Sequence, residues 1–442
     1  MRVDARYWAS QTSTRPNGCL PNSKCDCRVL LRSTSYFLAS ACALHWLDAA
    51  FAPVDWKTLS NSFSLTQTLF SMKSIYTIVL AFACIVIFNA SASAQGCVAV
   101  RHMSCAAPAG SADYFKQRTG HWQVSAGYRF FRSYKHFVGD EEQKQRVQQG
   151  TNVINVSHAI DLGLTYMVNQ RLSFSVNLPI QYNDRSSLYE HYGNAIAQNP
   201  QQKRFDTQSQ GIGDLRLSGS YWLVNPVKLP KANLAVGLGV KLPTGNYGVT
   251  DDFHKLTKEG TDYTINKPVD QSIQLGDGGV GVSVELQGYV SLTKTLTAYA
   301  NGFYLFNPRE TNSTVRNPEA TTIDLVTGNF SVADQFAARL GLSQSIKAIP
   351  GLAVMLGGRV EGVPAIDAFG GSSGFRRPGY IVSVEPGLAY MRHKTSIAAT
   401  VPVAVYRNRI TSYADRLDPL GLKHGDAAFA DYLVSINVSR WF

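Results

Sequence analysis

Ionisable side chains recur in this 442-residue sequence within short segments where apolar and polar residues alternate. Five are basic and five are acidic: Arg129, Arg216, Lys241, Arg339, Arg359, Asp161, Asp214, Glu285, Glu361 and Glu385. Opposite charges in equal number can pair across an interior, and charges that stay hydrated can contact a dissolved molecule. Two interpretations remain open. In one, the charges form a ladder of pairs that only neutralise one another on an inner wall; in the other, they form a lining that contacts a solute.

Nucleophilic chemistry has one suggestive location, the adjacent Ser157 and His158. A serine nucleophile needs a histidine base within hydrogen-bonding reach and a third group that orients the base. Chain neighbours in an alternating segment point to opposite faces, so this serine and histidine point apart. His254, His393 and His424 are isolated, and Cys19, Cys25, Cys27 and Cys42 lack paired zinc spacing. We therefore expect no metal, no cofactor and no enzyme, with a membrane lipid hydrolase kept as an alternative.

The segments that must position these side chains have a period of two. In residues 171–182, RLSFSVNLPIQY, apolar side chains from Leu172 to Tyr182 face one side and polar ones the other. Twelve such segments are predicted as strands: 121–132, 152–167, 171–183, 211–224, 232–245, 278–291, 295–306, 333–346, 351–364, 379–391, 395–408 and 430–442. The fold class expected is all-β, a transmembrane antiparallel up-and-down β-barrel of about 12 strands.

The gaps between these strands are alternately long and short, which orients the barrel. Short turns follow the even-numbered strands and belong to the periplasm, whereas long polar gaps such as 184–210 and 246–277 belong to the outside. Four prolines, Pro179, Pro243, Pro364 and Pro402, are predicted to mark the points where strands leave the membrane, because proline removes a ladder donor. Aromatic girdles are expected at both interfaces, with Trp122, Tyr166, Tyr221, Trp222, Tyr390 and Trp441 on the periplasmic side.

The N-terminal part is predicted to be processed. Residues 72–94 have the basic start, the apolar stretch and the small-residue ending of a secretory signal peptide, which would be cleaved between Ala94 and Gln95. Residues 1–71 are expected to be a disordered upstream extension, and residues 95–120 a periplasmic tail before the 121–442 barrel. Cys97 and Cys105 are expected to form a disulfide in an oxidising periplasm, the alternative being two free thiols.

Composition and the C-terminus agree with an exported membrane protein. The net charge of +11 is not gathered into an aromatic-flanked basic face, so nucleic acid is not an expected partner. Outer-membrane lipid is the expected surroundings. The last strand, YLVSINVSRWF, alternates and ends on an aromatic residue, which resembles the signal that barrel-insertion machinery reads; its outward residues are Tyr432, Val434, Ile436, Val438 and Phe442.

Two short motifs point to a family. Gly211-Ile212-Gly213-Asp214-Leu215 opens the fourth strand and Leu242-Pro243-Thr244-Gly245 closes the fifth. This pairing over residues 120–442 resembles the outer-membrane transporters named after the meta-pathway of phenol degradation, which are grouped near the long-chain fatty-acid channels. The resemblance implies transport of small solutes, apolar or aromatic ones included, but no defined site residues. The chain lacks the long N-terminal plug of a gated fatty-acid channel.

The glycine-rich run from Gly276 to Gly281 is not followed by Gly-Lys-Ser/Thr, so a flexible approach to a strand is expected there, not a nucleotide loop. The function expected is passive passage of small solutes through a polar, charge-balanced interior in the outer membrane of a Gram-negative bacterium. The alternatives are the lipid hydrolase and a non-conducting surface scaffold or adhesin.

Overall fold

The computed structural model describes residues 121–442, which form the predicted barrel. The expected extension 1–71, signal peptide 72–94 and tail 95–120 lie outside the described residues. The same is true of the cleavage position at Ala94 and Gln95 and of the Cys97 and Cys105 pairing. Those expectations therefore stay predictions.

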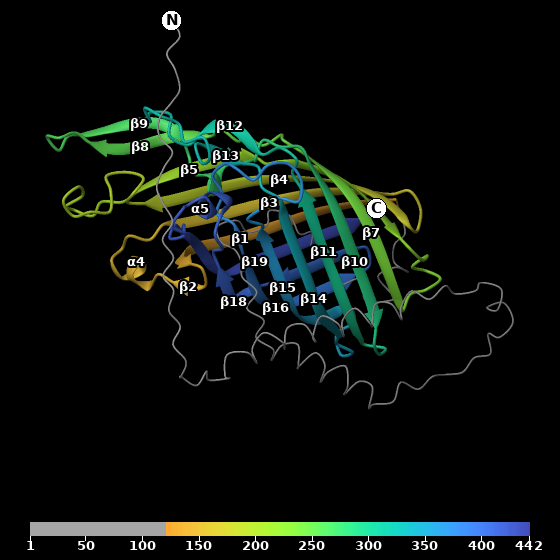
Figure 1. Ribbon diagram of the computed structural model, residues 1–442. Helices are drawn as coiled ribbons and strands as arrows, with labels where there is room; N and C mark the ends of the chain where they lie inside the picture. The colour runs from red at the N-terminus through yellow and green to blue at the C-terminus, as the bar shows by residue number, and fades with distance from the viewer. Residues whose placement is uncertain (1–120) are drawn as a thin grey trace, which may run out of the picture. The chain divides into compact units, whose positions relative to one another are not determined.

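The described chain is a closed antiparallel barrel (Figure 1), which confirms the predicted fold class. The first strand, β1 (Trp122–Val138), pairs with the last, β19 (Ala427–Trp441), over most of its length. Between them the wall runs through β3 (Ile154–Met167), β4 (Leu172–Ser187), β5 (Phe205–Ile212), β6 (Leu215–Trp222), β7 (Ala232–Leu242), β10 (Gly281–Ser291), β11 (Leu296–Phe306), β14 (Gln335–Ser345), β15 (Leu352–Val363), β16 (Gly379–Arg392), β17 (Thr395–Thr400) and β18 (Val403–Asn408).

Two of the twelve wall strands are interrupted. The fourth consists of β5 and β6, which both pair with β4 and are separated at Gly213 and Asp214. The eleventh consists of β17 and β18, which are separated at Val401 and Pro402. Pro243 and Pro364 follow strand ends as predicted, but Pro179 lies inside β4, opposite the β5–β6 break, where its carbonyl accepts a bond from the Gly213 amide (2.7 Å). The prediction that Pro179 marks a strand exit is wrong, because the break occurs in the neighbouring strand.

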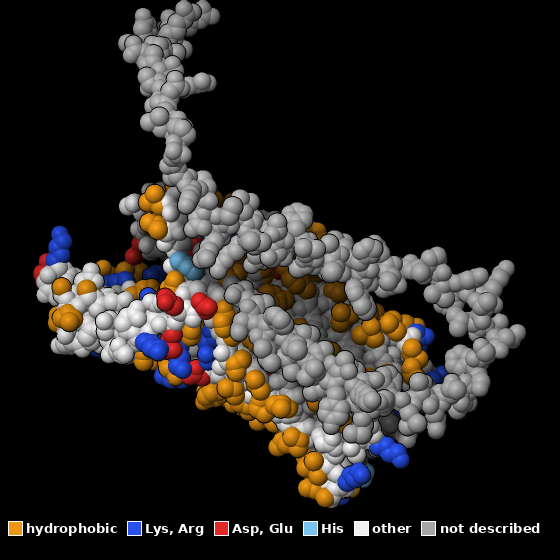
Figure 2. Space-filling view, turned by 60° about the horizontal axis from the view of Figure 1, so that its bottom comes forward, with side chains coloured by type: hydrophobic (Ala, Val, Ile, Leu, Met, Phe, Trp, Pro, Cys, Tyr) orange, Lys and Arg blue, Asp and Glu red, His pale blue; other side chains and the backbone are white. Residues whose placement is uncertain are grey.

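The two faces of the wall differ as the alternation predicts. On β7, Leu234, Val236, Leu238 and Val240 are exposed on the outside, whereas Ala235 and Lys241 are buried on the inside. Figure 2 shows hydrophobic side chains spread over the outside of the wall, with charged side chains gathered toward its ends. An apolar outer band on a closed sheet is what a bilayer requires, because every backbone donor and acceptor must be paired within the protein.

The two ends of the barrel carry different connections. One end has the short turns, the start of β1 and the end of β19. The other end has the long loops, which include two further hairpins. These hairpins are β8 (Thr250–Leu256) with β9 (Asp262–Pro268), and β12 (Thr311–Val315) with β13 (Asn329–Ser331). The same end holds β2 (Glu141–Glu142), α4 (Lys144–Gln148), the 3-10 turn η1 (Gln271–Ile273) and α5 (Tyr413–Arg416). By the barrel convention the long-loop end is extracellular.

No helix within residues 121–442 is long and apolar enough to cross a bilayer.

The periplasmic aromatic girdle is only partly as predicted. Trp122 and Tyr166 lie on the outer face with ring centroids 4.6 Å apart, and the Arg171 guanidinium lies over the Tyr221 ring at 4.4 Å. Trp222 and Trp441 instead point inward and are buried; Trp222 packs against Tyr289. Their strand parity places them on the inner face, so they fill the periplasmic end of the lumen and do not contact headgroups.

The position of the apolar outer band in the bilayer can be tested by placing one charged side chain on it. Leu286, in the middle of β10, is half exposed on the outer face. Leu286→Arg is expected to lower the free energy of unfolding by about 2–4 kcal/mol, because a lipid-facing arginine near the bilayer midplane must be desolvated. Urea unfolding in phospholipid vesicles measures it. Leu420→Arg, in an extracellular loop, is the control; equal effects of the two substitutions would contradict the assigned bilayer position.

Candidate functional site: a clasped loop above a polar cavity

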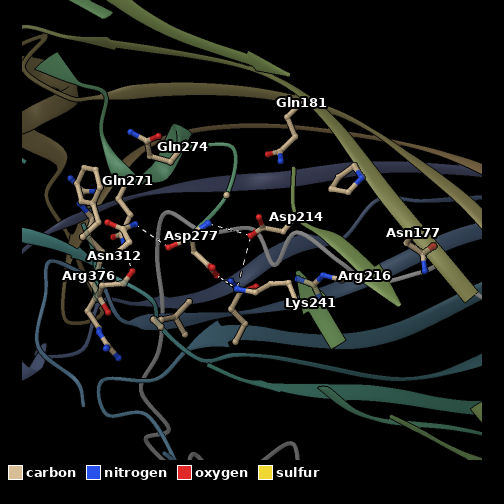
Figure 3. Close-up of a pocket in the computed structure, with 18 of the residues that line it drawn as sticks. Asn177, Gln181, Asp214, Arg216, Lys241, Gln271, Gln274, Asp277, Asn312 and Arg376 are labelled. Atoms are coloured by element: carbon tan, nitrogen blue, oxygen red, sulfur yellow. Dashed lines mark hydrogen bonds and ion pairs between the residues drawn. The ribbon is translucent and has the colours of Figure 1, made fainter. Parts of the chain in front are cut away.

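Three sequence motifs that lie far apart in the chain meet at Asp214 (Figure 3). One carboxylate oxygen of Asp214 accepts a hydrogen bond from the Gly245 amide (3.0 Å), and the other accepts one from the Asp277 amide (3.2 Å). The Asp277 side chain in turn pairs with Lys241, whose ammonium lies 4.0 Å from Asp214. We call Asp214, Lys241, Gly245 and Asp277 the clasp. It joins the β5–β6 break to the ends of the loop between β7 and β10.

The Leu-Pro-Thr-Gly motif completes this junction through its last two residues. The Thr244 hydroxyl donates to the Gly213 carbonyl (2.9 Å) and accepts from the Leu215 amide (2.8 Å), so it bridges the gap between β5 and β6. Gly245 lies directly against Gly276: a Cβ placed on Gly245 would meet the Gly276 Cα at 2.9 Å. Glycine is therefore required at this close approach of two backbones.

The loop between β9 and β10, residues 269–280, folds into the barrel from the extracellular end. Gln181, on the inner face of β4, donates to the Leu275 carbonyl (3.1 Å), and Asn183 and Ser209 both reach the Ile273 carbonyl. Ile273 and Gln274 are buried. Since backbone carbonyls of the loop accept bonds from inward side chains of the wall, the loop is held across the lumen, not above it. We call residues 269–280 the inward loop.

The inward loop is also tied to the opposite side of the mouth. Arg377 holds Asp270 through two bonds of 2.7 Å, and Gln271 donates to the Ser331 carbonyl (2.8 Å). Asp270 is further 3.6 Å from Arg185. These two arginines hold the pKa of Asp270 well below its usual range despite its burial, which alone would raise it.

A polar cavity of ≈ 70 Å³ lies beneath the inward loop. Its lining combines amides and charges with a few apolar groups; Asn177, Gln181, Arg216, Gln271, Asn312 and Phe330 are among the residues that form it. A space of this size holds a few water molecules. Figure 3 shows Lys241 and Arg216 side by side, with Asn177 of β4, the cross-strand partner of Arg216, beyond them and Gln181 of the same strand farther up.

Arg216 and Lys241 are direct cross-strand neighbours in β6 and β7. Like charges in such a pair repel each other. Lys241 is neutralised by Asp277 and Asp214, whereas Arg216 forms no ion pair with any residue of the described barrel. The Arg216 guanidinium lies 5.9 Å from the Phe303 ring, on the inner face of β11. Arg216 is thus a half-buried cation that faces the cavity.

The other predicted ionisable residues also lie on the inner face, but they pair along the wall and not across the lumen. Arg129 of β1 binds Asp161 of β3 (2.6 Å). Arg359 binds Glu361 of its own strand (2.7 Å), and Arg339 and Arg359 flank Glu385 at 3.6 and 3.9 Å.

Glu285 accepts from the Ser283 hydroxyl (3.0 Å). Local pairing has a simple cause: cross-strand neighbours are about 5 Å apart, much closer than opposite sides of a twelve-stranded barrel.

Ser157 and His158 point to opposite faces, as predicted. His158 lies on the outer face against the Tyr128 hydroxyl (2.9 Å) and the Phe130 ring, and the Ser157 hydroxyl donates inward to Asn183 (2.7 Å). The pair that a serine hydrolase would need is not formed at this position. Within residues 121–442, no three His, Cys, Asp or Glu side chains are grouped so that they could hold a metal ion.

Sequence reasoning singled out Asp214 and Lys241 but missed their partner, Asp277. That residue was assigned with Gly276 and Gly278 to a flexible approach to β10. The approach is instead fixed: Gly278 has φ +80°, and Asn312 donates to the Asp277 carbonyl (2.9 Å). An aspartate inside a glycine-rich run, 32 residues after the Gly245 of the Leu-Pro-Thr-Gly turn, is the signal in the sequence.

Comparison with solved structures finds other barrels. The CymD monoaromatic hydrocarbon channel is 10% identical with a TM-score of 0.37, covering 75% of this chain and 91% of that chain. The P. putida toluene transporter TodX is 9% identical with a TM-score of 0.34, over 75% and 92%. The β domain of the Bordetella autotransporter BrkA is 11% identical with a TM-score of 0.38, over 73% and 100%. No protein-family model and no curated protein matches the sequence.

The closed sheet and its apolar outer band decide the location. The chain is an outer-membrane β-barrel. The structural neighbours include aromatic-hydrocarbon channels and an autotransporter. TM-scores below 0.5 and identities near 10% assign the chain to neither group.

The clasp can be tested at Asp214. Asp214→Asn is expected to lower the free energy of unfolding by about 1–3 kcal/mol, because a neutral amide accepts two backbone bonds poorly and leaves Lys241 with one carboxylate fewer. Hydrogen exchange of residues 269–280 should rise in parallel. Asp206→Asn, on the exposed face of β5, is the matched control. Unchanged exchange of the inward loop in Asp214→Asn would contradict the clasp.

Proposed function

We propose that this barrel lets small solutes, aromatic ones among them, pass the outer membrane through its lumen, with the inward loop as the constriction. The observation that carries the proposal is the polar cavity beneath that loop. It lies on the axis side of the wall, is lined by residues of wall strands that include β4, β6 and β7, and is bounded by residues of three extracellular connections. Its lining joins charged and amide groups to Phe330 and Pro179, which suits solutes with a small apolar body and a polar group.

The inner wall below the cavity combines small and large side chains. Between the charged residues and the periplasmic end, the inner positions of β7, β14 and β17 are mostly Gly, Ala and Ser, for example Gly237, Gly239, Gly341 and Ala398. Larger inner side chains lie beside some of them: the Tyr299 hydroxyl is next to Gly341, and Met355 packs against Ala398. The neighbours CymD and TodX, named as a monoaromatic hydrocarbon channel and a toluene transporter, suggest aromatic compounds as the solutes to test first.

A cavity of ≈ 70 Å³ does not hold an aromatic ring together with its hydration, so passage requires the inward loop to shift. The loop is held by hydrogen bonds to inward side chains of β4 and β5 and by the Arg377 ion pair, contacts that water can replace. The clasp fixes Asp277, near the C-terminal end of the inward loop, while the residues before it move. Passage is therefore passive, and its rate is set by this displacement.

Arg216 gives a test of the lumen's electrostatics. Arg216→Gln is expected to shift the permeability ratio toward cations by about two- to threefold, since a unit charge about 7 Å away is worth about 0.6 kcal/mol in water. Reversal potentials across planar bilayers in a KCl gradient measure it. Lys228→Gln, in an exposed periplasmic turn, is the control. An unchanged ratio in a conducting channel would mean that Arg216 does not face the ion path.

Arg359 should behave differently from Arg216, because it is buried between two glutamates. Arg359→Gln is expected to cost about 3 kcal/mol of unfolding free energy, since it leaves Glu361 and Glu385 partly uncompensated. Its effect on ion selectivity should be smaller than that of Arg216→Gln. Thermal or urea unfolding of both variants, alongside the bilayer recordings, separates a structural arginine from one that contacts ions. The reverse order of effects would contradict the assigned roles.

The alternatives are separated by two further assays. Release of fatty acid from phospholipid vesicles would support the lipid hydrolase, and absence of both hydrolysis and conductance would support a surface scaffold or adhesin. The exposed outer position of His158 and the inward Ser157 speak against the first of these at that site.

We further propose that barrel-insertion machinery reads the last strand. Tyr432, Ile436 and Val438 are exposed on the outer face of β19, and Phe442 is 57% exposed at its end. Deleting Phe442 is expected to reduce the folded, heat-modifiable fraction recovered from outer membranes severalfold, whereas Phe442→Tyr should keep it. Equal recovery of the deletion and of the parent chain would argue against this signal.

A further inference from the structure

A second, larger cavity of ≈ 380 Å³ lies outside the barrel proper, at the extracellular mouth. Its walls come from three segments: the β8–β9 hairpin, the chain that follows β4 near Tyr189, and the residues between β12 and β13. None of these belongs to the membrane-spanning wall. The cavity is open to the outside and shares Phe330 and its neighbourhood with the polar cavity beneath the inward loop.

Three cations line this outer cavity: Lys255 of β8, Lys267 of β9 and Arg316. None of them forms an ion pair with a carboxylate in residues 121–442; each instead contacts backbone carbonyls or an aromatic ring. Lys255 donates to the Glu190 and His191 carbonyls at 2.9 and 3.1 Å. Lys267 lies 4.4 Å from the Phe253 ring, and the Arg316 guanidinium lies 3.5 Å from the Phe375 ring.

The acidic residues of the same cavity are already engaged. Glu190 is bound by Arg185 (2.8 Å) and Asp270 by Arg377 (2.7 Å). Asp324 accepts the backbone amides of Val326 and Thr327 at 2.7 and 2.9 Å. The cavity therefore holds three cations that form no ion pair within the described residues, while Glu190 and Glu319 act on the two lysines from a greater distance, in the direction that raises their pKa.

The charged forms of these three side chains are destabilised by their surroundings. Burial lowers the pKa of Lys267, and burial followed by the charge of Lys267 lowers the pKa of Lys255; burial and then Arg377 lower that of Arg316. Bringing an anion among them would relieve both causes, because it would replace lost hydration and oppose the mutual repulsion. Phe253, Val315 and Ile323 supply an apolar wall beside the charges.

We propose that this outer cavity binds a phosphate-bearing molecule with a small apolar part, through Lys255, Lys267 and Arg316. Three cationic donors that line one cavity suit a group with several acceptor oxygens and more than one negative charge. The apolar wall would take an aromatic or short aliphatic substituent. The same chemistry is offered by a soluble phosphate monoester and by the phosphates of a lipid headgroup. This binding does not depend on passage through the barrel.

The test uses the full exported chain in an uncharged, phosphate-free detergent. One arm titrates phenyl phosphate, with phenol as the uncharged comparison; the other titrates lipopolysaccharide, whose phosphates are carried on a lipid. Lys267→Gln and Arg316→Gln are each expected to weaken binding by about tenfold or more, because a hydrogen bond to a charged group is lost. Lys258→Gln, at the exposed tip of the same hairpin, should bind as the parent does.

Binding of phenyl phosphate that is sensitive to Lys267→Gln and Arg316→Gln supports the proposal with a soluble ligand. Binding confined to lipopolysaccharide, with the same sensitivity, supports it with a lipid headgroup. If neither phosphate binds more tightly than phenol, or if both variants bind as Lys258→Gln does, the proposal is overturned. Because no membrane is crossed in these titrations, their failure leaves the conductance of the barrel a separate result.

Discussion

The structure depends on the requirement that every backbone amide and carbonyl inside a bilayer be paired within the protein. A sheet meets it only by closing on itself, which β1 and β19 do through antiparallel pairing from Gln123 to Phe137, with register shifts on either side of Ser133. Closure gives the wall two faces, and the alternation of residues then sends apolar side chains to the lipid and polar ones to the lumen. The same constraint explains why the charged residues of the strands face the lumen. A charged residue one position earlier or later in a strand would face lipid.

Closure also explains why the clasp is needed. Where β5 and β6 separate at Gly213 and Asp214, backbone groups of the wall lose strand partners. The Thr244 hydroxyl and the Asp214 carboxylate supply the missing bonds, and in doing so they tie the β7 end to the Asp277 backbone. Lys241 balances the two aspartates that this arrangement buries. The interactions that bridge the break between β5 and β6 therefore also hold the inward loop, which narrows the lumen.

The sequence predicted the wall well because the wall is governed by local alternation. Most strand ends agree within about three residues, as for the predicted strand 295–306, where β11 spans Leu296–Phe306. Two differ by six residues: β1 continues to Val138 and not 132, and the fourth strand begins at Phe205 and not 211. The inner parity of all ten ionisable residues followed from the same pattern. Their partners did not, because pairing depends on strand register, which alternation does not specify for neighbours on one face.

What sequence reasoning missed lies in the loops. The β8–β9 and β12–β13 hairpins were included in long polar gaps, and the glycine-rich run at 276–281 was expected to be flexible. Loops fold through contacts between distant segments, such as Arg377 with Asp270, which leave no periodic signal. Trp222 and Trp441 show the opposite error: a preference for interfaces was given more weight than the strand parity that points them inward.

The most direct test is the conductance of a barrel without residues 246–275, which include the β8–β9 hairpin and the inward loop as far as Leu275. Because Gly245 lies against Gly276, residues 246–275 can be deleted and these two glycines joined while Asp214, Lys241 and Asp277 remain in place. A constriction formed by this loop predicts a folded, heat-modifiable variant whose single-channel conductance in planar bilayers exceeds that of the parent severalfold. A folded variant with the parent's conductance, or with none, would contradict it.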